Sequence, residues 1–327
     1  MARAYIKSLS AGQFVDGEVY LLAQKDLRST TQKSLYIHAV LADRTGQILA
    51  RIWQASQELY DLLPQDGFVR VRGRTESYKG ALQFIVEGID PVPIEQVDLE
   101  EFLAKTDQDI DQMYKRLLDI LRGIKDQHLL YLVKQFVSDE PLMKRFKSAP
   151  AAIQMHHACI GGLLEHTLNV LELVLLIVPR YSQINPDLML VGAFLHDIGK
   201  TRELTWDSVF KYTEEGQLVG HLLIGSMLVE EKAKAVAAEL GRPFPLRLLQ
   251  VIQHMILSHH GDYTFGSPKL PMTTEAISLH YLDNLDAKLD MARRQIAESD
   301  STDPDADWTG YIKGLDRKLF KADVFKS

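Results

Sequence analysis

The sequence predicts a chain of two different parts, an all-β barrel followed by an all-α bundle. Two patterns and the chain length lead to this prediction. Apolar and polar residues alternate along short runs in residues 1–93, as they do in strands with one buried face. After about residue 99 the apolar residues recur at helical spacing instead. The 327 residues are enough for two domains of roughly 100–200 residues each.

The first part contains about five short strands, most of them separated by turn signals. The strands are expected within residues 14–22, 35–42, 48–53, 68–74 and 82–89, and a short helix is expected near 56–63. One short helix between the third and fourth of five strands is the layout of an OB-fold, a Greek-key barrel. Pro91 and Pro93 end this unit, because proline cannot continue a central strand.

These patterns divide the chain into four segments. We expect the OB-fold domain in residues 1–93, a helical linker in 94–150, a helical domain in 151–300 and a C-terminal tail in 301–327. Ser148, Ala149 and Pro150 break the helical pattern between the linker and the domain that follows.

Composition limits where the protein works and what it binds. The single cysteine, Cys159, cannot form an internal disulfide, and the N-terminus shows no signal peptide, so we expect a cytoplasmic protein. The most apolar stretch, residues 163–178, looks too short and too charged for a membrane span, so no membrane partner is expected. The net charge of −7 argues against a general nucleic-acid coat, so any such site must be a local basic patch.

Histidine and aspartate side chains gather in the helical part, which holds ten of the eleven histidines. We expect one helix over residues 188–198, with Gly199 as its stop, and a long helix that begins at His221. Five predicted helices each contribute one or two of these groups, which are His166, His196, Asp197, His221, His259, His260 and Asp283. Helical bundles build metal sites from facing helices in this way.

The residue types predict a centre for divalent ions rather than a structural zinc site. Imidazole binds Mn, Fe, Co or Zn, and carboxylate suits harder ions, whereas a structural zinc site usually needs cysteines that this chain lacks. A carboxylate beside a ligand histidine can bridge two metals, which together can activate water against a phosphodiester. The alternative is a set of unrelated core and surface histidines, which the His196-Asp197 pair followed by Gly199-Lys200 makes improbable.

The segment Ala193-Phe194-Leu195-His196-Asp197-Ile198-Gly199-Lys200, with His166 before it and Asp283 after it, resembles the signature of the HD superfamily of metal-dependent phosphohydrolases. A barrel in front of an HD domain indicates a narrower family than the HD signature alone. Together with residues 155–158, 161–166, 258–261 and 282–288, this pairing resembles the YhaM-type 3′-to-5′ exoribonuclease family over most of the chain.

The resemblance implies roles for individual residues. One ion would be held by His166, His196, Asp197 and Asp283, with Asp197 bridging to a second ion held by His221 and by one or both of His259 and His260. Manganese is the first choice for both ions, with Fe, Co, Zn or Mg as alternatives. Asp197 and Lys200 would be the catalytic residues, Lys200 through a phosphate oxygen, and the groups that support the ligands or the substrate would be His157, His280 and Asp286.

The barrel carries a candidate surface for single-stranded nucleic acid. Arg70, Arg72 and Arg74 alternate along one predicted strand and therefore project from the same face. OB-folds bind single strands with a basic groove and stacking aromatics, for which Lys79, Tyr36 and Trp53 are further candidates. The alternative is an ordinary solvated strand face.

The expected function is metal-dependent 3′-to-5′ hydrolysis of single-stranded RNA, with single-stranded DNA as a possible second substrate and nucleoside 5′-monophosphates as products. The polarity and the RNA preference follow from the family resemblance alone. Two alternatives stay open. One is an HD-type hydrolase of a small nucleotide or cyclic dinucleotide, and the other is a nucleic-acid-binding protein with a degenerate HD domain. The sequence leaves the oligomeric state open.

Overall fold

The computed structural model describes residues 3–30, 34–78, 81–153, 157–207, 209–302 and 306–325. The chain forms two compact units. The first comprises Met1–Lys105 together with Trp206–Val209, and the second comprises Thr106–Thr205 and Phe210–Ser327.

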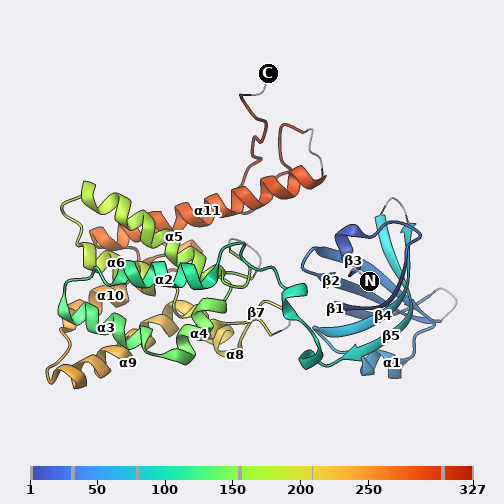
Figure 1. The fold of residues 1–327 in the computed structure, drawn as a ribbon, viewed down its shortest axis with the longest axis horizontal. Helices are drawn as coiled ribbons and strands as arrows, with labels where there is room; N and C mark the ends of the chain where they lie inside the picture. Colours follow the sequence, from blue (N-terminus) through green and yellow to red (C-terminus); the bar gives the residue numbers. More distant parts are fainter. Residues whose placement is uncertain are drawn as a thin grey trace. The chain divides into compact units, whose positions relative to one another are not determined.

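The first unit is a closed five-stranded barrel, with neighbouring strands in the order β1-β2-β3-β5-β4 (Figure 1). Strand β1 also pairs with β4, which closes the barrel, and only β3 and β5 run parallel to each other. The bounds are β1 (Phe14–Ser29), β2 (Leu35–Asp43), β3 (Gly46–Trp53), α1 (Gln57–Leu62), β4 (Gly67–Tyr78) and β5 (Ala81–Val92). The predicted OB-like barrel with one helix between its third and fourth strands is therefore confirmed.

The barrel interior is filled by the inward half of each alternating strand. In β4, Val69, Val71, Gly73 and Thr75 point inward and are buried. A Cβ at Gly73 would lie 2.1 Å from the carbonyl oxygen of Ile85, so only glycine fits at the bulge between these strands. Tyr20 and Phe84 pack edge to face at the centre. Two short 3₁₀ turns, η2 (Ile94–Gln96) and η3 (Leu99–Glu101), follow β5, and Phe102 packs its ring 4.7 Å from that of Phe68.

The second unit is a bundle of helices, and its elements place the functional residues (Figure 1). The segment expected to be a linker forms α2, α3 and α4, of which α2 packs against α5 and α3 against α9. The bounds are α2 (Ile110–Leu121), α3 (Gln127–Val137), α4 (Glu140–Ser148), α5 (Gly162–Ile177), α6 (Pro186–Leu195), α7 (Lys200–Glu203), α8 (Glu214–Leu218), α9 (His221–Leu240), α10 (Leu246–Ser258) and α11 (Thr274–Thr302), with the short strands β6 (Leu204–Thr205) and β7 (Lys211–Tyr212). The predicted all-α bundle is confirmed.

Helix α5 is the central helix of the bundle. With the 3₁₀ turn η4 (Val178–Arg180) it makes the span Gly162–Arg180, which is long and apolar enough to cross a membrane by length and composition. The expectation that this stretch is too short was therefore wrong. Half of its apolar window is buried inside the bundle, where it packs against α6 and α11, and it carries the fully buried His166. These contacts explain its composition as that of a core helix.

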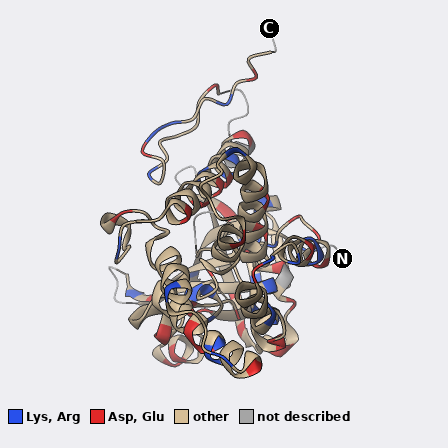
Figure 2. Ribbon diagram, turned by 90° about the vertical axis from the view of Figure 1, so that its left-hand side faces the viewer, with Lys and Arg blue, Asp and Glu red and all other residues tan. Residues whose placement is uncertain are grey.

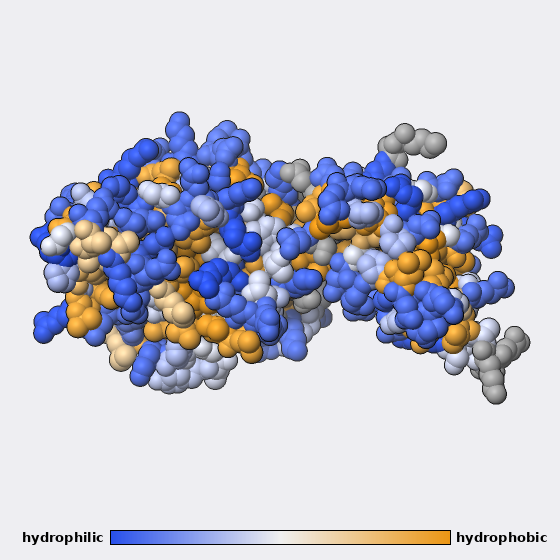
Figure 3. Space-filling view, turned by 90° about the horizontal axis from the view of Figure 1, so that it is seen from below, coloured by the Kyte–Doolittle hydropathy of each residue, from blue (hydrophilic) through white to orange (hydrophobic). Residues whose placement is uncertain are grey.

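The surface of the helical unit carries both signs of charge, which Figure 2 shows spread along the helices rather than gathered on one of them. Apolar residues also reach the surface of each unit in patches, which are orange in Figure 3. The tail after α11 is held by bridges between Trp308 and Phe320 and between Ile312 and Arg317, and Lys288 in α11 donates to the carbonyl oxygen of Gly314.

Candidate metal centre

Asp197 lies at the centre of the histidine and aspartate groups and is 1% exposed. It follows α6, which ends at Leu195 with His196 as its C-cap. The helix is therefore shorter than predicted, and Gly199 is not its left-handed stop. Gly199 has a φ of −62° and is the N-cap of α7. Glycine is needed there because a Cβ would lie 2.1 Å from the carbonyl oxygen of His221. That contact brings the start of α9 against the His196-Asp197 turn.

The two oxygens of Asp197 face two different groups of imidazoles. Its Oδ2 lies 3.4 Å from His196 Nε2 and 3.7 Å from His166 Nε2. Its Oδ1 lies 3.6 Å from His221 Nε2 and 3.5 Å from His259 Nε2. This oxygen is buried and accepts no hydrogen bond within the described part of the chain. A buried carboxylate oxygen of this kind calls for a hydrogen-bond donor or a bound cation.

Asp283 and His260 are the remaining two groups, and one lies on each side of Asp197. Asp283 from α11 places its Oδ1 3.2 Å from His166 Nε2, on the Oδ2 side of Asp197. His260 places its Nε2 3.2 Å from His221 Nε2, on the other side. Helix α10 ends at Ser258 and the rings of His259 and His260 then lie 4.5 Å apart and nearly perpendicular. Both members of the pair therefore reach the centre, which the sequence left open.

All five imidazoles direct their Nε2 toward this centre, because the Nδ1 of each one faces an oxygen. The Nδ1 atoms of His196, His259 and His260 face the carbonyl oxygens of Ala193, Ile256 and Phe265 at 2.8–2.9 Å. Those of His166 and His221 face the carboxylates of Asp286 and Glu203 at 2.7 and 2.8 Å. An Nδ1 that donates to an oxygen fixes the neutral tautomer whose Nε2 lone pair can bind a metal.

The donor set fits two divalent ions. Groups with ligand atoms within 4.8 Å of one another include His166, His196 and Asp197 on one side and His221, His259 and His260 on the other. The Nε2 atoms of His166 and His196 face each other at 3.2 Å, as do those of His221 and His260. Two lone pairs that point at each other repel unless a cation or a proton lies between them, and mixed imidazole and carboxylate ligands suit transition metals.

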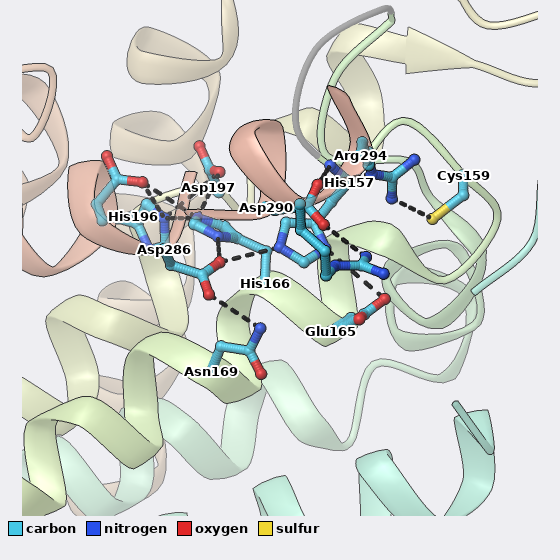
Figure 4. Close-up of polar contacts among 12 residues, drawn as sticks. His157, Cys159, Glu165, His166, Asn169, His196, Asp197, Asp286, Asp290 and Arg294 are labelled. Carbon is cyan, nitrogen blue, oxygen red and sulfur yellow. Dashed lines mark hydrogen bonds and ion pairs between the residues drawn. The ribbon is translucent and has the colours of Figure 1, made fainter. Parts of the chain in front are cut away.

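A second layer of polar contacts holds His166 in place (Figure 4). Asp286 lies between two imidazoles, with its Oδ2 2.7 Å from His166 Nδ1 and 3.0 Å from His157 Nε2. Asn169 donates to its other oxygen at 2.9 Å. The backbone of His157, which has a φ of 45°, donates to Asp290. Asp286 thus contacts the candidate ligand His166 directly, and His157 contacts it through Asp286.

Two more contacts hold the other histidines. The third predicted supporting residue, His280, faces the carbonyl oxygen of His259 with its Nδ1 at 2.8 Å. Glu203 was missed by the sequence analysis, although it holds both the backbone N–H and the Nδ1 of His221. Its position three residues after Lys200 was the only available signal, and nothing in the sequence linked it to His221 across β6, β7 and α8.

The barrel has an aromatic outer face that the sequence showed only in part. The rings of Tyr36 in β2 and Trp53 in β3 lie 5.1 Å apart. The guanidinium of Arg51, also in β3, lies 5.5 Å from the Trp53 ring centre and 5.7 Å from that of Tyr78 in β4. Trp53 and Tyr78 are about half exposed. Arg51 was missed because its register against Tyr78 depends on the intervening strand β5.

The predicted arginine stripe lies on the outer surface of β4, where the exposed positions alternate with buried ones. Arg70 donates to the carbonyl oxygen of Gly17 at 2.8 Å, and Arg72 pairs with Asp16 at 4.0 Å. Arg74 lies opposite Ile85 of β5. Lys79 is outside the described residues.

Comparison with known proteins agrees with this arrangement. The family model described as HD domain matches residues 163–288, which contain every group around Asp197. The 3′-5′ exoribonuclease YhaM of a Geobacillus species is 33% identical over 322 residues, covering 97% of this chain and 94% of its own length. The chain belongs to the YhaM exoribonuclease family.

Other members of the YhaM family show the same extent of similarity. The proteins of that name from Bacillus pumilus and Bacillus licheniformis are 33% and 32% identical, and they cover 89% and 96% of this chain and 90% and 96% of their own lengths. A solved structure of a replication protein A heterotrimer bound to ssDNA is 22% identical and has a TM-score of 0.20. The match covers 28% of this chain and 66% of the matched chain. The HD domain of this YhaM-family chain implies dependence on divalent metal.

The electrostatics of this YhaM-family centre favour a bound cation. Burial raises the pKa of Asp197, but Lys200 and His196 outweigh it and hold that pKa well below its usual range. Burial lowers the pKa of His260, and the neighbouring His259 and His221 lower it further, to about 3. Asp197 therefore stays ionised and His260 stays neutral near pH 7, which are the forms that bind metal.

Replacing Glu203 with glutamine is expected to lower metal affinity on the His221 side about 10- to 100-fold, because a neutral amide no longer raises the basicity of His221 Nε2 through the hydrogen bond at Nδ1. Calorimetric titration of the apoprotein with metal measures this change in affinity. Glu215→Gln is the matched control, since Glu215 pairs with Arg202 at the exposed surface. Unchanged affinity in Glu203→Gln would mean that this carboxylate does not orient the histidine.

Proposed function

We propose that this chain is a metal-dependent exoribonuclease that hydrolyses single-stranded RNA from its 3′ end and releases nucleoside 5′-monophosphates. One observation carries the chemistry. Five imidazoles present Nε2 around the two oxygens of Asp197, each with its Nδ1 facing an oxygen. Membership of the YhaM family supports the polarity and the RNA substrate.

The geometry supports the following assignment of ligands. One ion would be held by His166, His196, Asp283 and Asp197 Oδ2, and the other would be held by His221, His259, His260 and Asp197 Oδ1. We propose manganese for both ions, because a set rich in imidazole with two carboxylates suits a borderline divalent metal. Zinc, iron, cobalt and magnesium are the other metals to test.

The ions, when bound, supply an activated water and charge stabilisation for in-line displacement at phosphorus. The chain's own residues orient that chemistry. Asp197 bridges the two groups of imidazoles, and Asp286 and Glu203 fix the orientation of His166 and His221. Lys200 holds its Nζ 2.7 Å from Asp197 Oδ2 in a buried position, from which its charge can act on a phosphate oxygen.

The barrel supports a polymer as substrate. Arg51 over the half-exposed Trp53 and Tyr78 combines positive charge with stacking surfaces, which is how OB-folds hold single strands. A small nucleotide would leave this face without a role, so we rank that alternative lower. The degenerate-domain alternative is disfavoured by the full set of ligands. We propose a cytoplasmic location, which an RNA substrate and the single cysteine, Cys159, without a disulfide support.

The test uses the purified chain with one labelled single-stranded RNA, its DNA analogue and a circular form of the same RNA, each with Mn, Mg, Co or Zn in turn. We expect stepwise shortening of the linear RNA from its 3′ end, with mononucleotide products. The circular RNA, which has no end, should stay intact. Cleavage of the circle would mean an endonuclease, and cleavage of only small nucleotides would favour the alternative.

Replacing Lys200 with methionine is expected to lower kcat about 100-fold while both ions stay bound, because ammonium is no metal ligand but stabilises charge on phosphate. Methionine fills a similar buried volume, and elemental analysis with turnover on RNA measures the two effects. Lys232→Met, at the Asp139 ion pair, is the control for removing a mostly buried lysine. Loss of metal in Lys200→Met would instead assign the lysine a structural role.

A further inference from the structure

The turn that follows His260 carries two exposed aromatic side chains. Its 3₁₀ turn η5 (Tyr263–Phe265) lies between α10 and α11. Phe265 is 70% exposed and Tyr263 is 62% exposed. Large apolar side chains stabilise a fold through burial, so two exposed rings in one short turn contribute little to the stability of this chain.

The backbone of this turn is fixed, although its rings are exposed. Asp262 caps the turn by accepting from the backbone N–H and the hydroxyl of Thr264, both at 2.8 Å. The buried Ser267 closes it by donating to the carbonyl oxygens of Leu257 and Lys269. Gly266 takes the left-handed conformation that ends η5. Rings on a fixed backbone can bind a partner at a low cost in conformational entropy.

The turn is also joined directly to the metal centre. His260 Nδ1 lies 2.9 Å from the carbonyl oxygen of Phe265, and His260 Nε2 lies 3.2 Å from His221 Nε2. A single imidazole ring therefore separates the backbone of the turn from the ligand atoms. The turn therefore borders the centre at which the phosphate of a substrate would bind.

We propose that Tyr263 and Phe265 form a stacking site for the base of the 3′-terminal nucleotide, whose 5′ phosphate is the one attacked at the metal centre. The inference rests on the proposed function, which requires a nucleotide at that phosphate. Stacking accepts any base because every base has a π face, which suits an enzyme that removes successive nucleotides. The site would act on KM and on positioning, not on the metals.

The test compares Phe265→Ala, Tyr263→Ala and Phe265→Trp in the full chain on two RNAs. One RNA ends in an ordinary nucleotide and the other ends in an abasic ribose, and only the first cleavage is timed. We expect each alanine variant to lose about tenfold or more in kcat/KM on the ordinary end, mostly through KM. On the abasic end the alanine variants should equal the unmodified protein. Phe265→Trp should retain activity on both.

Two controls separate this site from a general effect. Tyr181→Ala removes another half-exposed aromatic, which follows η4 at the C-terminal end of α5, whereas His166 lies near the start of that helix, and it should change nothing. Elemental analysis should find an unchanged metal content in every variant, because alanine at position 265 keeps the backbone carbonyl that faces His260 Nδ1. Equal losses on both RNAs, or no loss on either, would overturn the stacking site.

A binding measurement distinguishes failure of this inference from failure of the proposed function. Calorimetry compares adenosine 5′-monophosphate with ribose 5-phosphate on the Mn-loaded protein. We expect the nucleotide to bind at least about tenfold more tightly, and Phe265→Ala to remove that difference. If RNA is hydrolysed but the difference survives in both alanine variants, the inference alone fails. If no RNA is hydrolysed but the difference depends on Phe265, the proposed function fails and the base site stands.

Discussion

Asp197→Ala is expected to reduce RNA hydrolysis by at least about a thousandfold and to leave fewer than two ions per chain. The variant removes the carboxylate whose Oδ2 faces one set of imidazoles and whose Oδ1 faces the other. Two ions held as proposed would share this carboxylate, and its loss would remove several kcal/mol of charge stabilisation in the transition state. Elemental analysis and turnover on linear RNA measure the two losses together.

Folding must be checked in that variant, because alanine leaves the buried Lys200 without its ion-pair partner. An uncompensated buried charge can cost about 3–5 kcal/mol of stability. Asp197→Asn is the second variant, since its amide oxygen still accepts from Lys200 while the bridging charge is gone. Asp119→Ala, which removes an exposed carboxylate, is the control. Full turnover with two bound ions in Asp197→Asn would refute the bridging role.

A double variant, with Trp53 replaced by alanine and Arg51 by glutamine, is expected to bind long single-stranded RNA about 10- to 100-fold more weakly. The pair supplies a stacking surface and a charge at one place on the outer face of the barrel. Stacking contributes about 1–3 kcal/mol per base, and glutamine at position 51 can keep the contact with Gln83. Fluorescence anisotropy with labelled RNA measures affinity, and turnover on a dinucleotide should stay unchanged because its chemistry needs only the metal centre.

The arginine stripe of β4 provides a separate comparison on the same barrel. Alanine at Arg70, Arg72 and Arg74 should make the salt dependence of RNA binding shallower by about 2 in log-log slope, at about 0.7 per phosphate contact. If only the stripe variant weakens RNA binding, the arginines hold the strand and the aromatic face does not. If neither variant changes affinity for long RNA, the barrel serves another partner and the small-nucleotide alternative gains.

Local sequence patterns were enough to predict the two architectures and most of the side chains that gather around Asp197. The alternation of Val69, Val71 and Gly73 with arginines has the period of a strand, and it placed those arginines on one face. The His196-Asp197 pair and the distant Asp283 were found because few other chemistries need these residue types together. The family resemblance supplied the RNA substrate and its polarity, which no local pattern contains.

The sequence by itself therefore determined the strand and helix periods, the residue types of the metal centre and the family. The tertiary structure decided which groups meet. It ended α10 at Ser258 so that His259 and His260 both reach the centre, and it placed Glu203 on His221 and Arg51 over Tyr78. The physical reason is range. Periodicity depends on neighbours within one turn or two residues, whereas these contacts depend on how separate elements pack and in which register.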